Sequence, residues 1–94
     1  MAKGYWIAHV SVADEVRYED YKKANALAFS KYGARFLVRG GRFESVEGQA
    51  RDRHVVIEFD SYEQALACYD DPEYQRIKLL VSQAYERELS IIEG

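Results

Sequence analysis

The order in which strand-like and helix-like patterns follow one another is the feature that most restricts the fold of this chain. Over residues 5–12, apolar side chains recur at every second position, which is the period of a β-strand. Asp14 can cap a following helix, and residues 15–32 carry aromatic and apolar side chains three and four positions apart. Gly33 can end that helix in a left-handed conformation. The chain therefore begins with a strand followed directly by a long helix.

Two further strand patterns follow and are predicted to form a hairpin. Residues 34–39 and 53–59 both alternate between two faces. Gly40 and Gly41 stand just after the first of them and permit a bulge or a bend. Residues 42–46 are predicted to continue that strand toward a turn, so that the two strands form one long hairpin.

A helix with a break, and then a last strand, complete the pattern. Ser61 with Gln64 three residues later matches a capping box, in which both side chains satisfy free backbone N–H groups at a helix start. The helix is expected to break near residues 70–71, and Pro72 is suited to the first position of a further helical segment. Residues 88–93 are predicted to form a short final strand.

Taken in order, these elements read β-α-β-β-α-β, which is the split βαβ or ferredoxin-like pattern. The sequence thus predicts an α+β fold with a four-stranded antiparallel sheet and both helices on one face of it. Ninety-four residues, of which 48% are hydrophobic, suffice for one core and are too few for two. We expect a single domain over residues 1–94.

Charge and apolar patterning argue against two classes of partner. The chain has 13 Lys and Arg against 16 Asp and Glu, a net charge of -3 that disfavours the phosphate backbone of a nucleic acid. Its apolar runs are short and its first residues lack the stretch of a secretory signal, so we expect no membrane partner and a cytoplasmic location. Cys68 is the only cysteine, and we expect it to be a small buried apolar side chain.

Strand alternation divides residues between the helix side of the sheet and its open side. The helix side is expected to hold Trp6, Ala8, Val10, Phe36, Val38, Val55, Ile57 and Phe59. The open side is expected to hold Tyr5, Ile7, His9, Arg35, Leu37, Arg39, His54, Val56 and Glu58. Leaving the apolar members of the second set in water would expose a patch of the kind that marks an interface. We therefore predict a homodimer in which two sheets pack face to face and polar residues line a cleft.

Short motifs in a fixed order run through nearly the whole chain. They are Gly4-Tyr5-Trp6-Ile7-Ala8-His9-Val10, Asp14 with Tyr18 and Tyr21, Tyr32-Gly33, Leu37-Val38-Arg39-Gly40-Gly41, Glu47-Gly48, Val56-Ile57-Glu58-Phe59, Tyr69 with Asp71-Pro72-Glu73-Tyr74-Gln75, and Glu93-Gly94. This set resembles the family known as domain of unknown function 1330, a branch of the dimeric α/β-barrel group. The resemblance implies a ferredoxin-like protomer that dimerises through its sheets, and it implies no established chemistry.

A candidate catalytic pair lies on the open side of the expected sheet. His9 and Glu58 fall on the first and third strands, which are neighbours in this topology. A carboxylate orients an imidazole beside it, and partial burial can bring either group toward the pKa that a general base requires. The alternative is an ion pair between Arg39 and Glu58, with His9 hydrogen-bonded nearby, that only satisfies polar groups at a dimer cleft.

Tyrosines and one arginine indicate a place for a small molecule. Tyr5, Tyr21, Tyr69 and Tyr74 are expected to reach the cleft or its mouth, where flat rings with polar tips suit a small hydrophobic ligand. The alternative is that these side chains pack in the core, as tyrosines at helical spacing often do. Arg39 can anchor the carboxylate of a ligand.

We expect no metal and no other cofactor. His9 and His54 are the only histidines, and no close spacing of ligands resembles a zinc or iron site. Gly40 and Gly41 do not belong to a phosphate-binding loop. Two functions remain open. One is a small cofactor-independent enzyme that abstracts a proton from, isomerises or oxygenates a hydrophobic substrate, and the other is a non-catalytic ligand-binding or structural homodimer.

Overall fold

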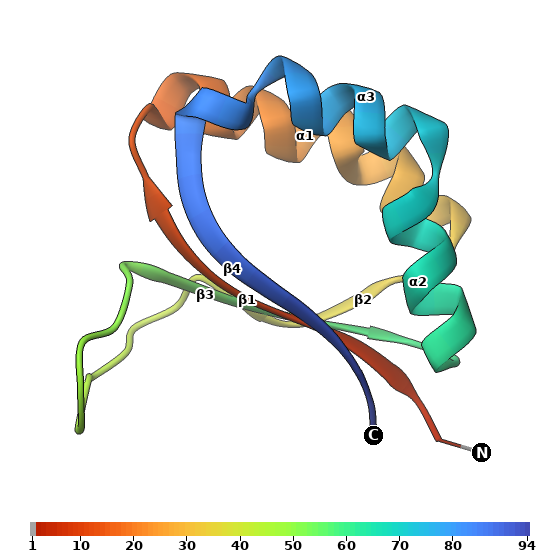
Figure 1. Cartoon of the computed structure of the whole chain (residues 1–94), viewed down its shortest axis with the longest axis horizontal. Helices are drawn as coiled ribbons and strands as arrows, with labels where there is room; N and C mark the ends of the chain where they lie inside the picture. Colours follow the sequence, from red (N-terminus) through yellow and green to blue (C-terminus); the bar gives the residue numbers. More distant parts are fainter. Residues whose placement is uncertain (1) are drawn as a thin grey trace.

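The helices lie on one side of a curved antiparallel sheet, and the other side of the sheet is open (Figure 1). The computed structural model describes residues 2–94. The four strands are ordered β2-β3-β1-β4. In chain order the elements are β1 (Gly4–Val12), α1 (Glu15–Lys31), β2 (Arg35–Arg39), β3 (Arg53–Phe59), α2 (Tyr62–Asp70), α3 (Pro72–Leu80), the 3-10 helix η1 (Ser82–Ala84) and β4 (Tyr85–Glu93). This arrangement confirms the expected α+β, ferredoxin-like fold.

The helix ends lie where their capping residues place them. Asp14 accepts a hydrogen bond from the backbone N–H of Arg17 at 3.0 Å, and Ser61 accepts one from the backbone N–H of Gln64 at 3.0 Å. Gly33, just after α1, has a φ of +71°. Both predicted helix starts and the predicted left-handed residue after α1 are confirmed. None of the helices in the described part of the chain is long and apolar enough to cross a membrane.

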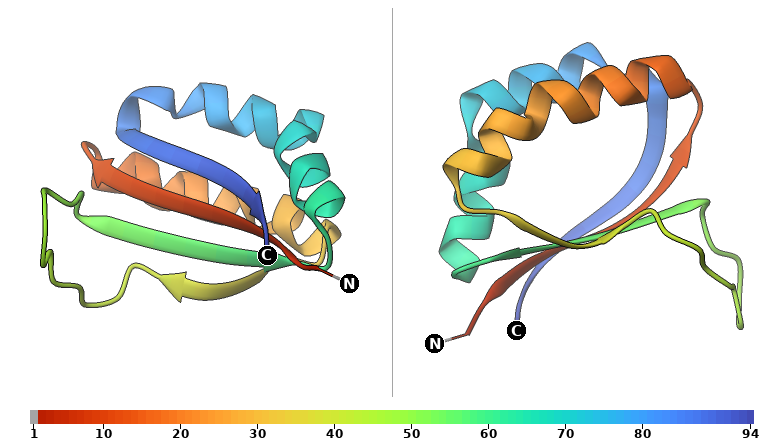
Figure 2. Two further views of the ribbon diagram at one scale, coloured as in Figure 1. Left: turned by 60° about the horizontal axis from the view of Figure 1, so that its bottom comes forward. Right: turned by 180° about the vertical axis from the view of Figure 1, so that it is seen from behind.

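Two expected strand boundaries are wrong, both because of strand pairing. β4 begins at Tyr85, since residues 85–88 pair with the end of β1. No strand forms over residues 42–46. Gly40, with a φ of +71°, turns the chain away from β3, and residues 41–52 form a loop that projects beyond the sheet (Figure 2). Gly41 has no positive φ.

A β-bulge in β2 reverses the expected facing of the residues after it. The pairing with β3 shifts between Phe36 and Val38, so Leu37 is an extra residue in the ladder. As a result Val38 faces the open side, and Arg39 lies opposite Val55 on the helix side. We expected the reverse for Val38 and Arg39, and both assignments are wrong.

The core between the sheet and the helices is rich in aromatic rings. Trp6 packs against Phe29 and Tyr74 with ring centroids 5.2 and 5.3 Å away, and its Nε1 donates to the carbonyl of Ala65 at 2.9 Å. Cys68 is fully buried beside this cluster, and burial raises the pKa of its thiol to about 12. Cys68 is therefore an unreactive, buried side chain, as expected.

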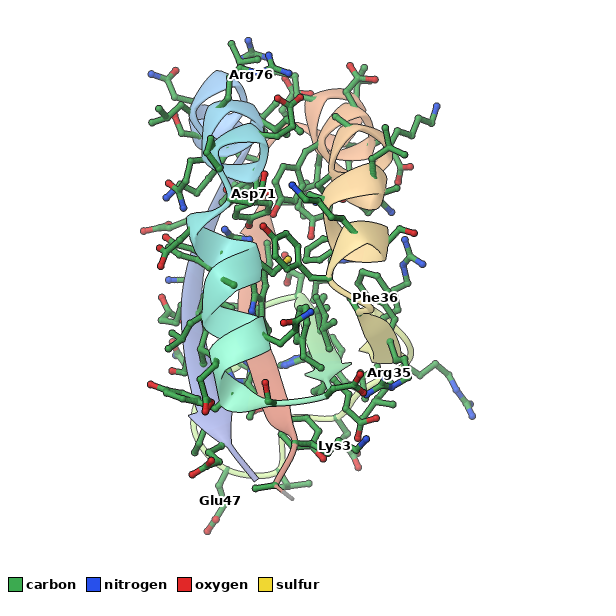
Figure 3. All side chains as sticks on the ribbon, turned by 90° about the vertical axis from the view of Figure 1, so that its right-hand side faces the viewer. Lys3, Arg35, Phe36, Glu47, Asp71 and Arg76 are labelled. Carbon is green, nitrogen blue, oxygen red and sulfur yellow. The ribbon has the colours of Figure 1, made fainter. Side chains whose placement is uncertain are left out.

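A buried carboxylate joins α2 and α3 to the end of α1. Asp71 is 4% exposed and lies where the two later helices meet (Figure 3). Its Oδ2 accepts hydrogen bonds from Tyr32 Oη at 2.8 Å and from Lys31 Nζ at 3.1 Å. Its Oδ1 accepts from the backbone N–H groups of Glu73 and Tyr74. These donors, with Tyr32 first and Lys31 second, lower the pKa of Asp71 to about 2.

Replacing Asp71 with asparagine is expected to lower Tm at neutral pH. In strong acid, wild type and variant are expected to have the same Tm. Because the pKa of Asp71 falls from 3.8 to about 2 on folding, the carboxylate stabilises the fold above pH 3.8 and loses that contribution as pH falls toward 2. The measurement is the difference in Tm between wild type and Asp71→Asn across this range, with exposed Asp52→Asn as the control. A difference that stayed constant down to the lowest pH would contradict the assignment.

Candidate functional site

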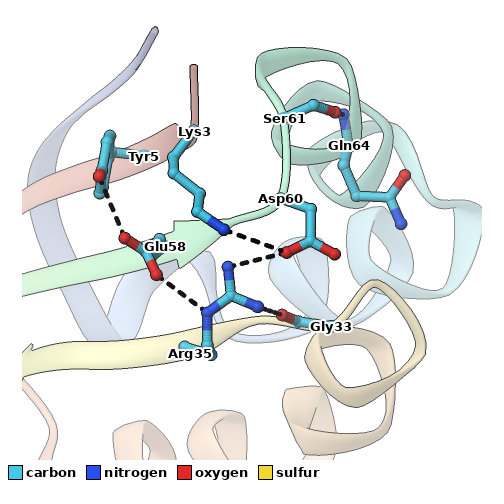
Figure 4. A network of polar contacts seen from close by, with 8 residues as sticks. All are labelled: Lys3, Tyr5, Gly33, Arg35, Glu58, Asp60, Ser61 and Gln64. Atoms are coloured by element: carbon cyan, nitrogen blue, oxygen red, sulfur yellow. Dashed lines mark hydrogen bonds and ion pairs between the residues drawn. The ribbon is translucent and has the colours of Figure 1, made fainter. Parts of the chain in front are cut away.

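A network of charged residues lies on the open side of the sheet, beside the start of β1 (Figure 4). Glu58 accepts hydrogen bonds from Arg35 Nε at 2.9 Å and from Tyr5 Oη at 3.1 Å. Arg35 also lies 3.0 Å from Asp60, and Lys3 approaches the same oxygen at 3.7 Å. The hydrogen bond from Arg35, and then that from Tyr5, hold the pKa of Glu58 below its usual value. Glu58 is thus an ionised member of a salt-bridge network.

Neither of the contacts expected for Glu58 is formed. Arg39 faces the other side of the sheet, so a different arginine pairs with Glu58. His9 lies opposite His54, with their Nδ1 atoms 2.9 Å apart. Glu58 lies opposite Tyr5, which is four positions from His9 along β1 and hence roughly 13 Å away. The expected pairing of His9 with Glu58 is wrong, and a catalytic role for either residue stays a prediction.

The four candidate tyrosines lie in different places. Tyr5 is on the open side of the sheet. Tyr69 lines a shallow groove beside α3 and β4, and a hydrogen bond from Lys78 at 2.9 Å lowers the pKa of its hydroxyl. Tyr21 and Tyr74 are buried between the sheet and the helices, with their Oη atoms 2.7 Å apart. The structure therefore joins Tyr21 and Tyr74 through their hydroxyls and packs the ring of Tyr69 against that of Tyr74, with centroids 5.8 Å apart, whereas Tyr5 lies on the other side of the sheet.

A cavity of about 40 Å³ lies between the sheet and α1. This volume is about three times the roughly 10–15 Å³ that one water molecule needs. Aromatic and aliphatic side chains, among them Trp6 and Phe36, form much of its wall. Two residues predicted from the sequence, Tyr21 and Arg39, line it. The polar part of the wall comprises Tyr18, Tyr21, Lys22, Asn25, Arg39, Arg53 and Arg87.

Arginines stand on both sides of the central strand β1. Arg53 of β3 and Arg87 of β4 both lie opposite Val10. Two strand spacings separate their backbones by roughly 10 Å. The bulge in β2 brings Arg39 to the same side of the sheet, beside Arg53. The two flanks of the cavity are therefore both positively charged.

These three arginines have no carboxylate partner in the described part of the chain. Within residues 2–94, salt bridges of up to 4.0 Å are made by other arginines, namely Arg35, Arg51 and Arg76. The Nε atom of Arg53 is buried and has no hydrogen-bond partner. The guanidinium of Arg87 donates to the hydroxyls of Tyr21 and Tyr74 at 3.0 and 2.9 Å. Because a guanidinium keeps its charge in proteins, the cavity carries a positive charge that these residues do not neutralise.

The hydroxyl groups near the cavity are neutral at physiological pH. Burial raises the pKa of Tyr18, and raises that of Tyr74 far above its usual value. Burial also raises the pKa of Tyr85 to about 12. These side chains therefore offer O–H groups and no negative charge to the arginines.

Gly40 leaves room for the side chain of one of the three arginines. The Cα of Gly40 lies against the guanidinium of Arg53, and a Cβ at this position would overlap with Nη1. Its backbone N–H also donates to the carbonyl of His54 at 2.9 Å. A glycine here both permits the positive φ and leaves room for the Arg53 side chain.

Replacing Gly40 with alanine is expected to destabilise the protein by about 1–2 kcal/mol, because a Cβ is unfavourable at positive φ and must displace Arg53. Gly41→Ala is the matched control, since nothing lies within 4 Å of its Cβ position and its φ is not positive. The measurement is urea unfolding of both variants. Equal stabilities would show that Gly40 has no special role.

Three polar residues of the cavity were not predicted from the sequence, although each stands at a position of an apolar pattern. Arg53 shares the strand phase of Val55, which was placed on the helix side. Arg87 shares the phase of Leu89, but the strand was expected to begin one residue too late to include it. Asn25 lies on the apolar stripe of α1 and is 4% exposed. In each case a polar residue at an apolar position marked the cavity.

A family model described as a domain of unknown function (DUF1330) matches residues 3–94. No curated protein sequence matches this chain. Among solved structures, RPA0582, a protein of unknown function from Rhodopseudomonas palustris, is similar at a TM-score of 0.79 and 15% identity, over 99% of this chain and 82% of that one.

Two other solved structures share the fold. A dimeric ferredoxin-like protein of unknown function from Thermobifida fusca has a TM-score of 0.59 and 16% identity, over 99% of this chain and 92% of that one. SnoaB, a cofactor-independent oxygenase from Streptomyces nogalater, has a TM-score of 0.67 and 10% identity, over 100% of this chain and 94% of that one. At these identities the likeness shows the fold alone.

Proposed function

This chain belongs to the family of the domain of unknown function DUF1330, and we propose that it binds a small organic carboxylate in the cavity between its sheet and its helices. The observation that carries this proposal is the set of three arginines, Arg39, Arg53 and Arg87, around a cavity in which no carboxylate of residues 2–94 pairs with them. The ligand supplies the missing negative charge.

The cost of burying part of a charged side chain favours a ligand-binding role for these arginines over a purely structural one. The Nε of Arg53 is buried without a partner, which costs free energy, whereas an apolar side chain of similar volume would fill the same space without that cost. Arginine binds carboxylates through two parallel hydrogen bonds, so the unpartnered Nε of Arg53 suits this group. The aromatic wall around Trp6 and Phe36 would hold the apolar body of the ligand.

The proposal is limited to binding, because the cavity wall formed by residues 2–94 holds none of the Asp, Glu and His side chains that most often act as general bases. His9 and Glu58 lie on the open side of the sheet, so a catalytic role for them would need a substrate bound there. The oxygenase activity of SnoaB belongs to that protein.

The test is to compare carboxylic acids with their amides. Pentanoate and benzoate are expected to raise Tm in a concentration-dependent manner at pH 7, and pentanamide and benzamide are expected to have much smaller effects. The acid and the amide of each pair have nearly the same shape, so a difference between their effects on Tm is due to the charge of the acid. Calorimetric titration gives the affinities. Equal effects of acid and amide in both pairs would contradict the proposal.

We also propose that two copies of the chain form a homodimer through the open sheet face. Val38 and Ile92 are 43% and 51% exposed there, beside half-buried Ile7 and Val56. An apolar sheet face of this kind is stable when a second copy covers it. The dimeric neighbour from Thermobifida fusca supports this assembly.

Val38→Glu is expected to convert the dimer to a monomer, because it places a charge in the proposed interface, opposite Val56. Leu27→Glu is the control, since Leu27 is 82% exposed on α1, away from this face. Light scattering at micromolar concentration measures the molar mass of each variant. A monomeric wild type would contradict the proposed dimer.

A further inference from the structure

The hydroxyls of Tyr21 and Tyr74 and the guanidinium of Arg87 form a closed group of three hydrogen bonds. Arg87 Nη1 donates to Tyr21 Oη at 3.0 Å, and Nη2 donates to Tyr74 Oη at 2.9 Å. The two hydroxyl oxygens lie 2.7 Å apart. Arginine can only donate, so both hydroxyls accept from it.

One hydroxyl proton of the two tyrosines is left over, and burial decides which tyrosine carries it. Each tyrosine has one hydroxyl proton, and only one of the two can lie in the contact between Tyr21 and Tyr74. The other proton must point elsewhere. Tyr74 is fully buried, with the rings of Trp6 and Phe29 beside it, where an unpaired O–H would be costly. Tyr21 lines the cavity. The favourable arrangement therefore has Tyr74 donating to Tyr21, and Tyr21 donating into the cavity.

We infer that Tyr21 determines specificity for a ligand that carries a second, uncharged oxygen besides its carboxylate. This inference rests on the proposed carboxylate binding. Two N–H groups of Arg87 donate to the two tyrosines, whereas the Nε of Arg53 has no partner, so we assign the carboxylate to Arg53 and Arg39 on the other flank. A keto or hydroxyl oxygen of the same ligand then accepts from Tyr21.

The geometry of the sheet sets the separation of the two groups. Arg53 and Arg87 flank Val10 on opposite sides, with backbones roughly 10 Å apart. The groups that bind the carboxylate and the keto oxygen thus lie on different strands. This separation favours an oxo acid in which several carbon atoms separate the keto group from the carboxylate. Tyr74 and Arg87 are positioning residues, because they direct and polarise the Tyr21 hydroxyl without needing to touch the ligand.

The test compares 4-oxopentanoate with pentanoate, which differ by one keto oxygen. Wild type is expected to bind the oxo acid about fivefold more tightly, the value of one hydrogen bond. Tyr21→Phe is expected to abolish this preference, so that the variant binds both acids with equal affinity. Tyr18→Phe is the matched control, because Tyr18 lines the same cavity outside the hydrogen-bonded group. It is expected to keep the preference.

A measurement on the unmodified protein covers the case in which Tyr21→Phe does not fold. The oxo acid is expected to shift the tyrosine absorption band to the red on binding, and pentanoate is expected to leave it unchanged. If neither acid binds, the proposed function is wrong. If both bind equally and without a spectral difference, carboxylate binding stands and the role of Tyr21 is overturned.

Discussion

Replacing Gly4 with alanine is expected to destabilise the protein by about 3 kcal/mol or more and to lower Tm by more than about 10 °C. A Cβ at this position would overlap with the carbonyl oxygen of Ser61 and lie 2.6 Å from its carbonyl carbon. Both are backbone atoms of the residue that caps α2, so no side-chain rotation can relieve the contact. Either β1 or the start of α2 must move.

Thermal and urea unfolding of Gly4→Ala check this result, with Gly41→Ala as the unstrained control. The expected loss is larger than at Gly40, where the atoms that would give way are the end of a flexible arginine. A Gly4→Ala protein as stable as wild type would mean that the packing of β1 against α2 is looser than the structure has it.

Arg53→Met is expected to weaken carboxylate binding about tenfold or more while leaving the unliganded protein as stable as wild type, or more stable. A hydrogen-bonded charge contributes about 1.5–3 kcal/mol to binding, which gives the loss of affinity. The gain in stability follows because methionine fills similar space without burying an unpartnered Nε. Most substitutions in a protein core instead lower the free energy of unfolding.

Arg76→Met is the control, because Arg76 is exposed on α3 and paired with Glu73. It is expected to change neither affinity nor stability appreciably. The measurements are calorimetric titration with benzoate and urea unfolding without ligand. An Arg53→Met protein that was clearly destabilised, yet bound benzoate normally, would show that this arginine is structural.

The fold could be predicted because its signals are local. Alternation in β1, the caps Asp14 and Ser61, and Gly33 after α1 each act within a few residues, and all of them hold in the structure. The strand boundaries were predicted wrongly where they depend on pairing with another strand. Residues 42–46 alternate like a strand, but they have no partner in the sheet.

The candidate site was predicted only in part, since it depends on contacts between distant segments. Tyr21 and Arg39 were named from the sequence and line the cavity, but they were expected at a dimer cleft on the open side of the sheet, where His9 and Glu58 lie. The positions of Arg53 and Arg87 could be read from strand phase. Their lack of a carboxylate partner could not, because it depends on which acidic residues the whole fold brings near them.

The bulge at Leu37 also determines how this strand can change in length. Deleting Leu37 would restore a regular ladder with Phe36, Val38 and Arg39 facing as they do now. A chain of the present length with a regular ladder would instead place Val38 at the cavity and turn Arg39 outward. Relatives that are one residue shorter here can thus keep the cavity cation, and relatives of equal length that lack the bulge can lose it although the arginine itself is kept.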